Sequence, residues 1–87
     1  MPLRLDIITP ERNLLSETVD SVNVPGLNGE LGILPGHTPL LGVLVSGDVV
    51  IHGEGGQQTT TIDSGFISVE HDRVTIIAES VGAPGQS

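Results

Sequence analysis

The sequence contains no cysteine, no lysine and only two alanines among 87 residues. Without cysteine it has neither disulfide bonds nor thiolate metal ligands, and cysteine usage does not indicate a redox compartment. No segment approaches the roughly 18 consecutive apolar residues that a membrane-spanning helix needs. The N-terminus also lacks the charged region and apolar stretch of a signal peptide. We therefore expect a soluble protein without direct membrane insertion.

Positive charge is scarce in this chain. Three arginines stand against eleven acidic residues, and the formal net charge is −8 at pH 7. Such a surface repels phosphate groups, so we expect no nucleic acid as partner and no binding to anionic lipid. The acids are scattered rather than gathered in a tail, which suits a solubilising surface that could also meet a basic protein partner.

Residue usage favours β-structure. Valine, isoleucine and threonine together number 25, and β-branched side chains suit a pleated strand better than a helix. Twelve glycines and six prolines leave only residues 11–24 long enough for a substantial helix. Leu15, Val19 and Val22 have helical spacing there, but the β-branched content and Pro25 favour two strands. The sequence therefore predicts an all-β fold.

Strand-like segments recur at short spacing, with turn residues between them. The expected strands cover residues 3–9, 13–16, 18–24, 30–34, 39–46, 49–54, 57–63, 65–70 and 73–80. The segment 39–46 is nearly continuous in apolar residues, so we expect it to be covered on both faces. The pattern predicts an antiparallel β-sandwich of about ten short strands. We expect one domain over residues 1–80 and a flexible tail over residues 81–87.

The sequence carries no recognisable metal or nucleophile motif. His37, His52 and His71 each lack a second histidine two or four positions away, so no HExxH-type site is present and we predict no metal site. Neither a G-x-S-x-G elbow nor a cysteine–histidine pair is present, which leaves nucleophilic hydrolysis without its usual groups. We expect no cofactor and no catalytic residue.

Two glycine-containing motifs suggest other functions. Gly26, Gly29 and Gly32 are spaced like a phosphate-binding loop, but no helix is expected to follow them, so a sharp turn is favoured. Asp63-Ser64-Gly65 resembles the loop of dimeric, retroviral-type aspartic proteases. Phe66, however, stands where those proteases have a small residue, and a hairpin turn is expected there anyway. The protease and a generic β-sandwich interaction module stay open as alternatives.

The segment GELGILPGHTPLL, residues 29–41, combines apolar residues with glycines and prolines. Prolines and glycines fix a bent backbone that a partner need not order, and we expect its leucines and isoleucine to be exposed for contact. With residues 5–28 (LDIITPERNLLSETVDSVNVPGLN) and 62–80 (IDSGFISVEHDRVTIIAES), it resembles the epsilon-subunit family of F-type ATP synthases. The resemblance extends to about Ser80.

The resemblance implies a non-catalytic rotor subunit in the central stalk of a proton-translocating ATP synthase. Such a subunit is a β-sandwich that links the gamma subunit to the polar loops of the c-ring and couples proton transport to ATP synthesis, as a monomer in the complex. By motif, Glu30 and Leu31 are expected to contact the c-ring. The residues expected to contact gamma are Thr9, His37, Leu41 and Gly42. The implied location is the cytoplasmic face of a bacterial plasma membrane, or the equivalent face of an organellar coupling membrane.

The sequence departs from the family pattern in two places. Most members of the family continue into a pair of helices that inhibit ATP hydrolysis, whereas this sequence ends at Ser87. We therefore expect the inhibitory helices to be absent. Ser46-Gly47-Asp48 replaces a Pro-Gly turn that is frequent in the family, and we expect the turn itself to be retained.

Overall fold

A computed structural model describes residues 2–11 and 13–82, and within these ranges the chain forms strands and no helix. The strands are β1 (Leu3–Ile8), β2 (Asn13–Val19), β3 (Ser21–Gly26), β4 (Gly29–Ile33), β5 (Leu40–Leu44), β6 (Gly47–Gly53), β7 (Gly56–Ile62), β8 (Gly65–Glu70), β9 (Arg73–Ala78) and β10 (Val81–Gly82). The described part of the chain accordingly offers no helix that could cross a membrane. The predicted all-β class is confirmed.

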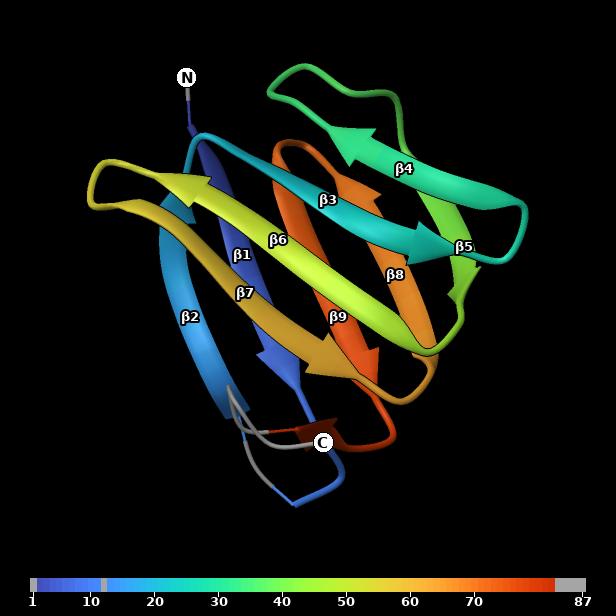
Figure 1. Cartoon of the computed structure of the whole chain (residues 1–87). Coiled ribbons are helices and arrows are strands. Elements are labelled where there is room, and N and C mark those ends of the chain that lie inside the picture. Colours follow the sequence, from blue (N-terminus) through green and yellow to red (C-terminus); the bar gives the residue numbers. More distant parts are fainter. Residues whose placement is uncertain (1, 12, 83–87) are drawn as a thin grey trace.

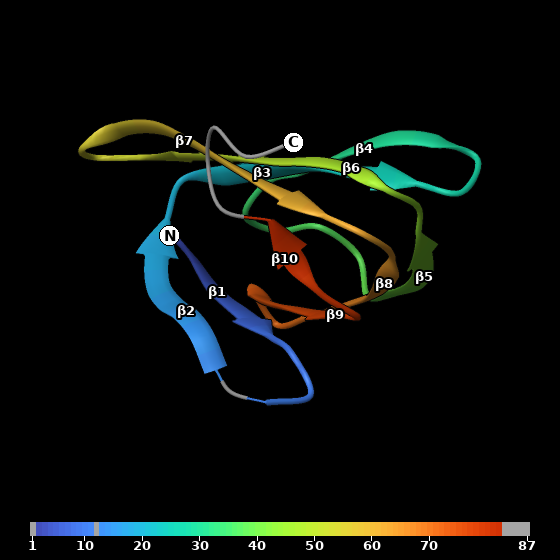
Figure 2. The ribbon, with the colours of Figure 1, turned by 60° about the horizontal axis from the view of Figure 1, so that its bottom comes forward.

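One ten-stranded sheet curls into two facing layers (Figures 1 and 2). In order of pairing, layer A contains β4, β3, β6 and β7 with the short β10 at its edge, and layer B contains β5, β8, β9, β1 and β2. The layers join at one side, where Gly26 of β3 pairs with Leu44 of β5. At the other side the chain passes from β2 to β3, and the Asp20 N–H donates to the His52 carbonyl oxygen at 2.7 Å. The predicted sandwich is therefore closed on both sides.

One pair of strands differs from the predicted antiparallel arrangement. β1 and β9 run parallel, with Leu5 opposite Val74 and Ile7 opposite Ile76, whereas the other pairs are antiparallel. A parallel pair needs a long connection, and here the chain between β1 and β9 supplies it. Alternation within a strand carries no information about which distant strand lies beside it, so the sequence could not indicate this pairing.

The core consists of the side chains that the two layers direct toward each other. In β1, Leu3, Leu5 and Ile7 are buried and alternate with Arg4 and Asp6, which lie on the outer side. Most of the other strands show the same period of two over at least part of their length, and their inward side chains form one aliphatic core in the described part of the chain. Burying one valine, leucine or isoleucine side chain contributes about 1.5–3 kcal/mol, which makes this core the main source of stability.

Strand β5 contradicts the expectation that residues 39–46 are covered on both faces. Leu44 is buried and Leu40 is packed against the core, but Leu41 is 84% exposed and Val43 is 46% exposed. The strand thus alternates between core and solvent. The prediction was wrong because an unbroken apolar run also arises when the outer face of a strand is itself apolar.

The end of the described chain extends the sheet beyond the predicted domain boundary at residue 80. In β10, Val81 pairs with Ile62 and Gly82 pairs with Thr61 of β7. The remainder of the predicted tail, residues 83–87, lies outside the described residues. β2 is also longer than the predicted strand at 13–16, because its pairing with β1 continues to Val19.

Candidate protein-docking surface

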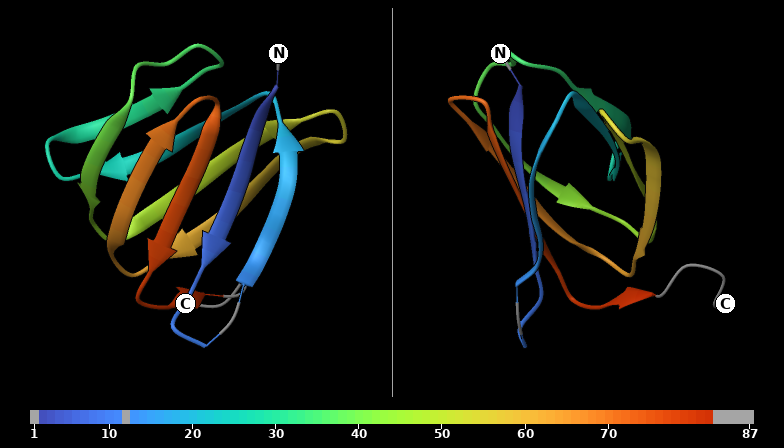
Figure 3. Two further views of the ribbon diagram at one scale, coloured as in Figure 1. Left: turned by 180° about the vertical axis from the view of Figure 1, so that it is seen from behind. Right: turned by 90° about the vertical axis from the view of Figure 1, so that its left-hand side faces the viewer.

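The outer face of layer B carries a row of apolar side chains on neighbouring strands. Val43 of β5 lies opposite Phe66 of β8, Phe66 lies opposite Ile77 of β9, and Ile77 lies opposite Ile8 of β1. Side chains directly opposite one another point to the same face of a sheet. Phe66 is 61% exposed, Ile77 is 50% exposed and Ile8 is half-buried. Figure 3, left, shows these four strands side by side.

Leu27 continues this row past the end of β3. Its N–H donates to the carbonyl oxygen of Val43 at 2.9 Å, and its side chain is 61% exposed. We refer to the row formed by Leu27, Val43, Phe66, Ile77 and Ile8 as the apolar stripe. Strands lie about 4.8 Å apart, so a row across five of them is about 19 Å long. An exposed apolar row of this length is unusual for a protein that acts alone.

A tight turn lies between β4 and β5, at the end of layer B where β1 and β9 begin. The His37 N–H donates to the Leu34 carbonyl oxygen at 3.1 Å, with Pro35 and Gly36 between them and a φ of 86° at Gly36. This is a type II turn, in which proline suits the first central position and glycine the second. His37 is half-buried, and its Nδ1 lies 2.7 Å from the Thr38 carbonyl oxygen. Because a carbonyl only accepts, Nδ1 is the donor in that contact.

The leucines and isoleucine of residues 29–41 are less uniformly exposed than predicted. Leu34 and Leu41 are exposed, but Leu31 and Leu40 are partly buried against the core, and Ile33 is fully buried. The expectation of an exposed isoleucine was wrong, because Ile33 occupies an inward position of β4. A depression of about 470 Å³ adjoins Leu41 between β5 and β8.

Of the glycines considered for a phosphate loop, two flank a hairpin turn instead, and Gly32 lies within β4, paired with β3. Gly26 pairs with Gly29, and Leu27 and Asn28 make the two-residue turn between β3 and β4. Gly29 has a φ of 126°, which only glycine adopts readily, and a Cβ on Gly26 would lie 2.6 Å from the Gly29 carbonyl oxygen. The expected sharp turn is confirmed.

The two predicted c-ring residues follow this hairpin turn. Glu30 is exposed and lies opposite Pro25, whereas Leu31 is half-buried and packs against the core. The structure therefore places a carboxylate on the outer surface beside the tip of the hairpin. Leu27, at the same tip, belongs to the apolar stripe, so the hairpin adjoins layer B's outer face.

Two predicted gamma contacts lie at opposite ends of layer B. Thr9 follows the end of β1 and is 8% exposed. His37 lies toward the start of β1, because Asp72 accepts hydrogen bonds from both the Gly36 N–H at 2.7 Å and the Arg4 N–H at 2.9 Å. At about 3.3 Å per residue, the five steps from Arg4 to Thr9 span about 17 Å. The structure does not bring Thr9 and His37 together.

The apolar stripe crosses layer B at the Thr9 end. Leu41 points outward two residues before Val43, and Ile8 directly precedes Thr9. Gly42 faces the core, since a Cβ there would lie 3.3 Å from a core side chain. Of the two neighbouring β5 residues predicted to contact gamma, only Leu41 directs a side chain outward.

The apolar stripe was not predicted, although the sequence contains a signal for it. Ile7–Ile8, Phe66–Ile67 and Ile76–Ile77 are adjacent apolar pairs within strands that otherwise alternate. In a strand, one member of such a pair faces the core and the other faces outward. Three outward members at matching positions on neighbouring strands make a surface row.

The Asp63-Ser64-Gly65 triplet has a structural explanation in the β7–β8 turn. The Ser46 hydroxyl donates to the carbonyl oxygen of Asp63 and lies 3.1 Å from its Oδ1. A Cβ on Gly65 would lie 2.1 Å from the Ile77 carbonyl oxygen, so glycine is required for β8 to approach β9. No group of three potential metal ligands occurs within residues 2–11 and 13–82.

Comparison with known proteins identifies the family of this chain. Residues 2–83 match the family model described as ATP synthase, Delta/Epsilon chain, beta-sandwich domain. The chain belongs to the ATP synthase delta/epsilon family. It is 47% identical over 79 residues to the ATP synthase epsilon chain of Micrococcus luteus, covering 90% of this chain and 87% of that protein. The epsilon chain of Frankia casuarinae is 44% identical, with coverage of 92% and 95%.

Other members of the family are longer. The Chloroflexus aggregans epsilon chain is 42% identical, and the match covers 93% of this chain but 58% of that protein. In the cryo-EM structure of the Euglena gracilis mitochondrial ATP synthase, OSCP/F1/c-ring, one chain superposes with a TM-score of 0.86 at 25% identity, covering 93% of this chain and 52% of that one. A chain of the Tetrahymena thermophila mitochondrial ATP synthase central stalk and c-ring, 15% identical with a TM-score of 0.80, shares the fold.

These comparisons confirm the resemblance drawn from residues 5–41 and 62–80. The epsilon chain of an ATP synthase is a structural and regulatory subunit and is not itself catalytic. Its relatives belong to a membrane-bound complex. The aspartic protease alternative is not supported.

Proposed function

We propose that this chain is a rotor subunit in the central stalk of a proton-translocating F-type ATP synthase, where it links the gamma subunit to the c-ring and couples proton transport to ATP synthesis. The family match over residues 2–83 carries this proposal. Structural neighbours in ATP synthase stalk and c-ring assemblies support it. The subunit acts by binding its neighbours and contributes no catalytic residue.

The outer face of layer B is the proposed gamma-binding surface. The apolar stripe supplies its main contact and crosses the face beside Thr9, Leu41 lies one outward position away on β5, and His37 lies at the far end of the layer. Fully burying a phenylalanine or leucine side chain contributes about 1.5–3 kcal/mol, so a few exposed anchors account for a stable contact. Gly42 takes part only through the backbone between Leu41 and Val43.

The β3–β4 hairpin is the proposed c-ring contact. Glu30 presents a carboxylate next to the hairpin tip, and polar loops of a c-ring that carry basic side chains would attract it. Leu31, packed against the core, holds Glu30 in place and adds its exposed part to the contact. The proposed location is the cytoplasmic face of a bacterial plasma membrane or the equivalent face of an organelle's coupling membrane.

Co-purification and reconstitution test this function. The tagged chain should retain the gamma subunit and the c-ring from solubilised membranes of its own organism. Membrane-bound synthase reconstituted without the chain should lose the coupling of proton transport to ATP synthesis, and the added chain should restore it. A generic β-sandwich interaction module would retain neither gamma nor the c-ring and would not restore coupling. Either result would overturn the proposal.

A further inference from the structure

The turn between β8 and β9 has an unusual backbone. His71 and Asp72 have φ values of 52° and 60°, in the left-handed region that residues other than glycine rarely adopt. Two-residue hairpins of this kind favour Asn-Gly or Asp-Gly, because both central residues need a positive φ. Asp72 therefore occupies a position at which glycine would cost less conformational strain.

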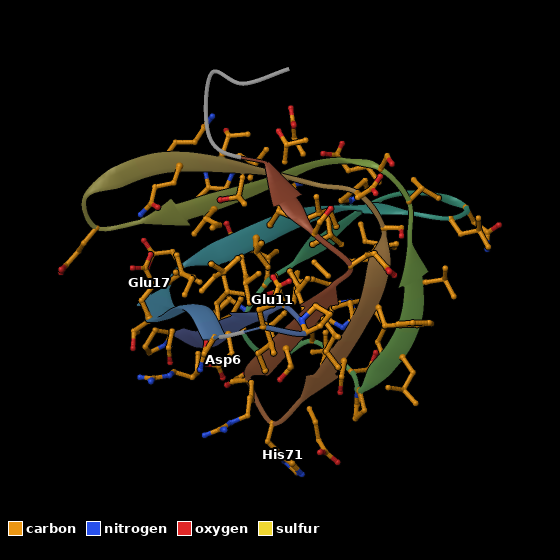
Figure 4. All side chains as sticks on the ribbon, turned by 90° about the horizontal axis from the view of Figure 1, so that it is seen from below. Asp6, Glu11, Glu17 and His71 are labelled. Atoms are coloured by element: carbon orange, nitrogen blue, oxygen red, sulfur yellow. The ribbon has the colours of Figure 1, made fainter. Side chains whose placement is uncertain are left out.

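The side chains of this turn point in different directions. His71 is exposed and points away from the rest of the protein (Figure 4). Asp72 is half-buried, and its Oδ1 accepts a hydrogen bond from the Gly36 N–H at 2.7 Å. Its carbonyl oxygen accepts a second bond from the Arg4 N–H at 2.9 Å, which fastens the turn to β1. Asp72 thus connects layer B to the type II turn that ends in His37.

This connection matters because the segment from Leu34 to Pro39 is the link between β4 of layer A and β5 of layer B. It forms no strand pairing of its own. Within the described residues, its hydrogen bonds are the short contacts inside the turn and the one to Asp72. The Asp72 carboxylate is therefore the tie that sets how the turn sits against layer B.

We infer that Asp72 is a positioning residue for gamma binding, which holds the Leu34–His37 turn in its binding conformation through the carboxylate bond to the Gly36 N–H. The inference rests on the proposed function. Without the bond, the turn samples other conformations, and affinity falls in proportion to the fraction that remains competent. The strained backbone at Asp72 fits this role, because glycine would satisfy the turn but could not supply the carboxylate.

Two substitutions at this residue separate the carboxylate bond from backbone strain. Asp72→Gly accepts the positive φ but removes the acceptor, whereas Asp72→Asn tolerates the φ and keeps an acceptor oxygen. In Asp72→Gly we expect the Gly36 amide to exchange with water roughly tenfold faster, measured by NMR. In Asp72→Asn the exchange rate should stay within about twofold of the wild-type value. Thermal unfolding should show no loss of stability in either variant.

Affinity for the purified gamma subunit of the same synthase completes the test. We expect Asp72→Gly to weaken binding roughly fivefold and Asp72→Asn to bind like the wild type. Unchanged Gly36 exchange in Asp72→Gly, equal losses in the two variants, or faster exchange with unchanged affinity would each overturn the inference. If wild-type chain does not bind gamma at all, the positioning role fails together with the proposed function. That case is recognised because Asp72→Gly would still accelerate Gly36 exchange.

Discussion

The two outer faces of the sandwich differ in chemistry, although alternating strands build both of them. On layer A, the outward side chains of β6 and β7 are mostly polar: His52 lies opposite Gln57, and Asp48 lies opposite Thr61. The Thr61 hydroxyl donates to the Asp48 carboxylate at 2.8 Å, so these two polar groups satisfy each other. On layer B, the equivalent face carries the apolar stripe.

Strand formation does not require this difference. Threonine and isoleucine are both β-branched, and both suit a pleated strand. Layer A uses threonine at outward positions such as Thr59, whereas layer B uses isoleucine at Ile77. Threonine would keep the strand and improve hydration at Ile77. The apolar choice on layer B is therefore explained by a partner that covers it.

The largest expected effect comes from breaking the alignment of the stripe itself. Gly65→Ala places a Cβ against the Ile77 carbonyl oxygen, so β8 and β9 must separate, and Phe66 and Ile77 lose their register. We expect a loss of about 3 kcal/mol or more in the free energy of unfolding, measured by denaturant titration. Gly55→Ala is the matched control, because no atom lies within 4 Å of its Cβ position. Equal stability of the two variants would contradict this account.

Next in size is the effect of placing a charge on each face in turn. Phe66→Asp puts an unpaired carboxylate in the middle of the stripe, and we expect about 100-fold weaker binding to the gamma subunit. Thr59→Asp makes the same change on layer A, where both the parent and the new side chain are exposed, and should leave affinity unchanged. Titration calorimetry on both variants measures the contrast. If Thr59→Asp is the more damaging of the two, layer A is the docking face.

A smaller effect is expected at the hairpin. Glu30→Lys places a positive charge beside basic c-ring loops, and we expect about tenfold weaker binding to the ring without a change in thermal stability. Raising the salt concentration should reduce this difference, because exposed charges are screened over about 8 Å at physiological ionic strength. Glu54→Lys, in the exposed β6–β7 turn, makes the same change of charge away from the β3–β4 hairpin. Equal losses in both variants would indicate a general effect of net charge instead.

The fold was largely predictable because its signals are local. Turns at residues 26–29 and 53–56 contain the glycines that a hairpin needs, and the strands between turns alternate with a period of two. The parallel pairing of β1 with β9 was not predictable, because it joins segments from opposite ends of the chain. The flanking signals at Thr9-Pro10 and Asp72 say only where each strand stops or starts.

The candidate site was predictable only in part. The family motif predicted partner contacts for Glu30, His37 and Leu41; Glu30 and Leu41 are exposed and His37 is half-buried, and the contacts themselves stay predictions. The stripe was missed because a residue such as Phe66 looks like core in a strand of apolar residues. Only the pairing of β8 with β5 and β9 shows that it joins Val43 and Ile77 on the outside.

The smallest expected effect concerns the polar groups that flank the stripe on layer B. Arg4 Nη2 donates to Ser16 Oγ at 2.7 Å, and that hydroxyl donates to Asp6 Oδ1 at 2.6 Å. All three groups lie at the surface, so Ser16→Ala should lower the free energy of unfolding by only about 0.5 kcal/mol. Ser16→Thr keeps the hydroxyl and should restore it. Because the stripe and not its polar border makes the proposed contact, gamma affinity should stay unchanged in both variants. A clear loss of affinity in Ser16→Ala, reversed in Ser16→Thr, would extend the docking surface to β2.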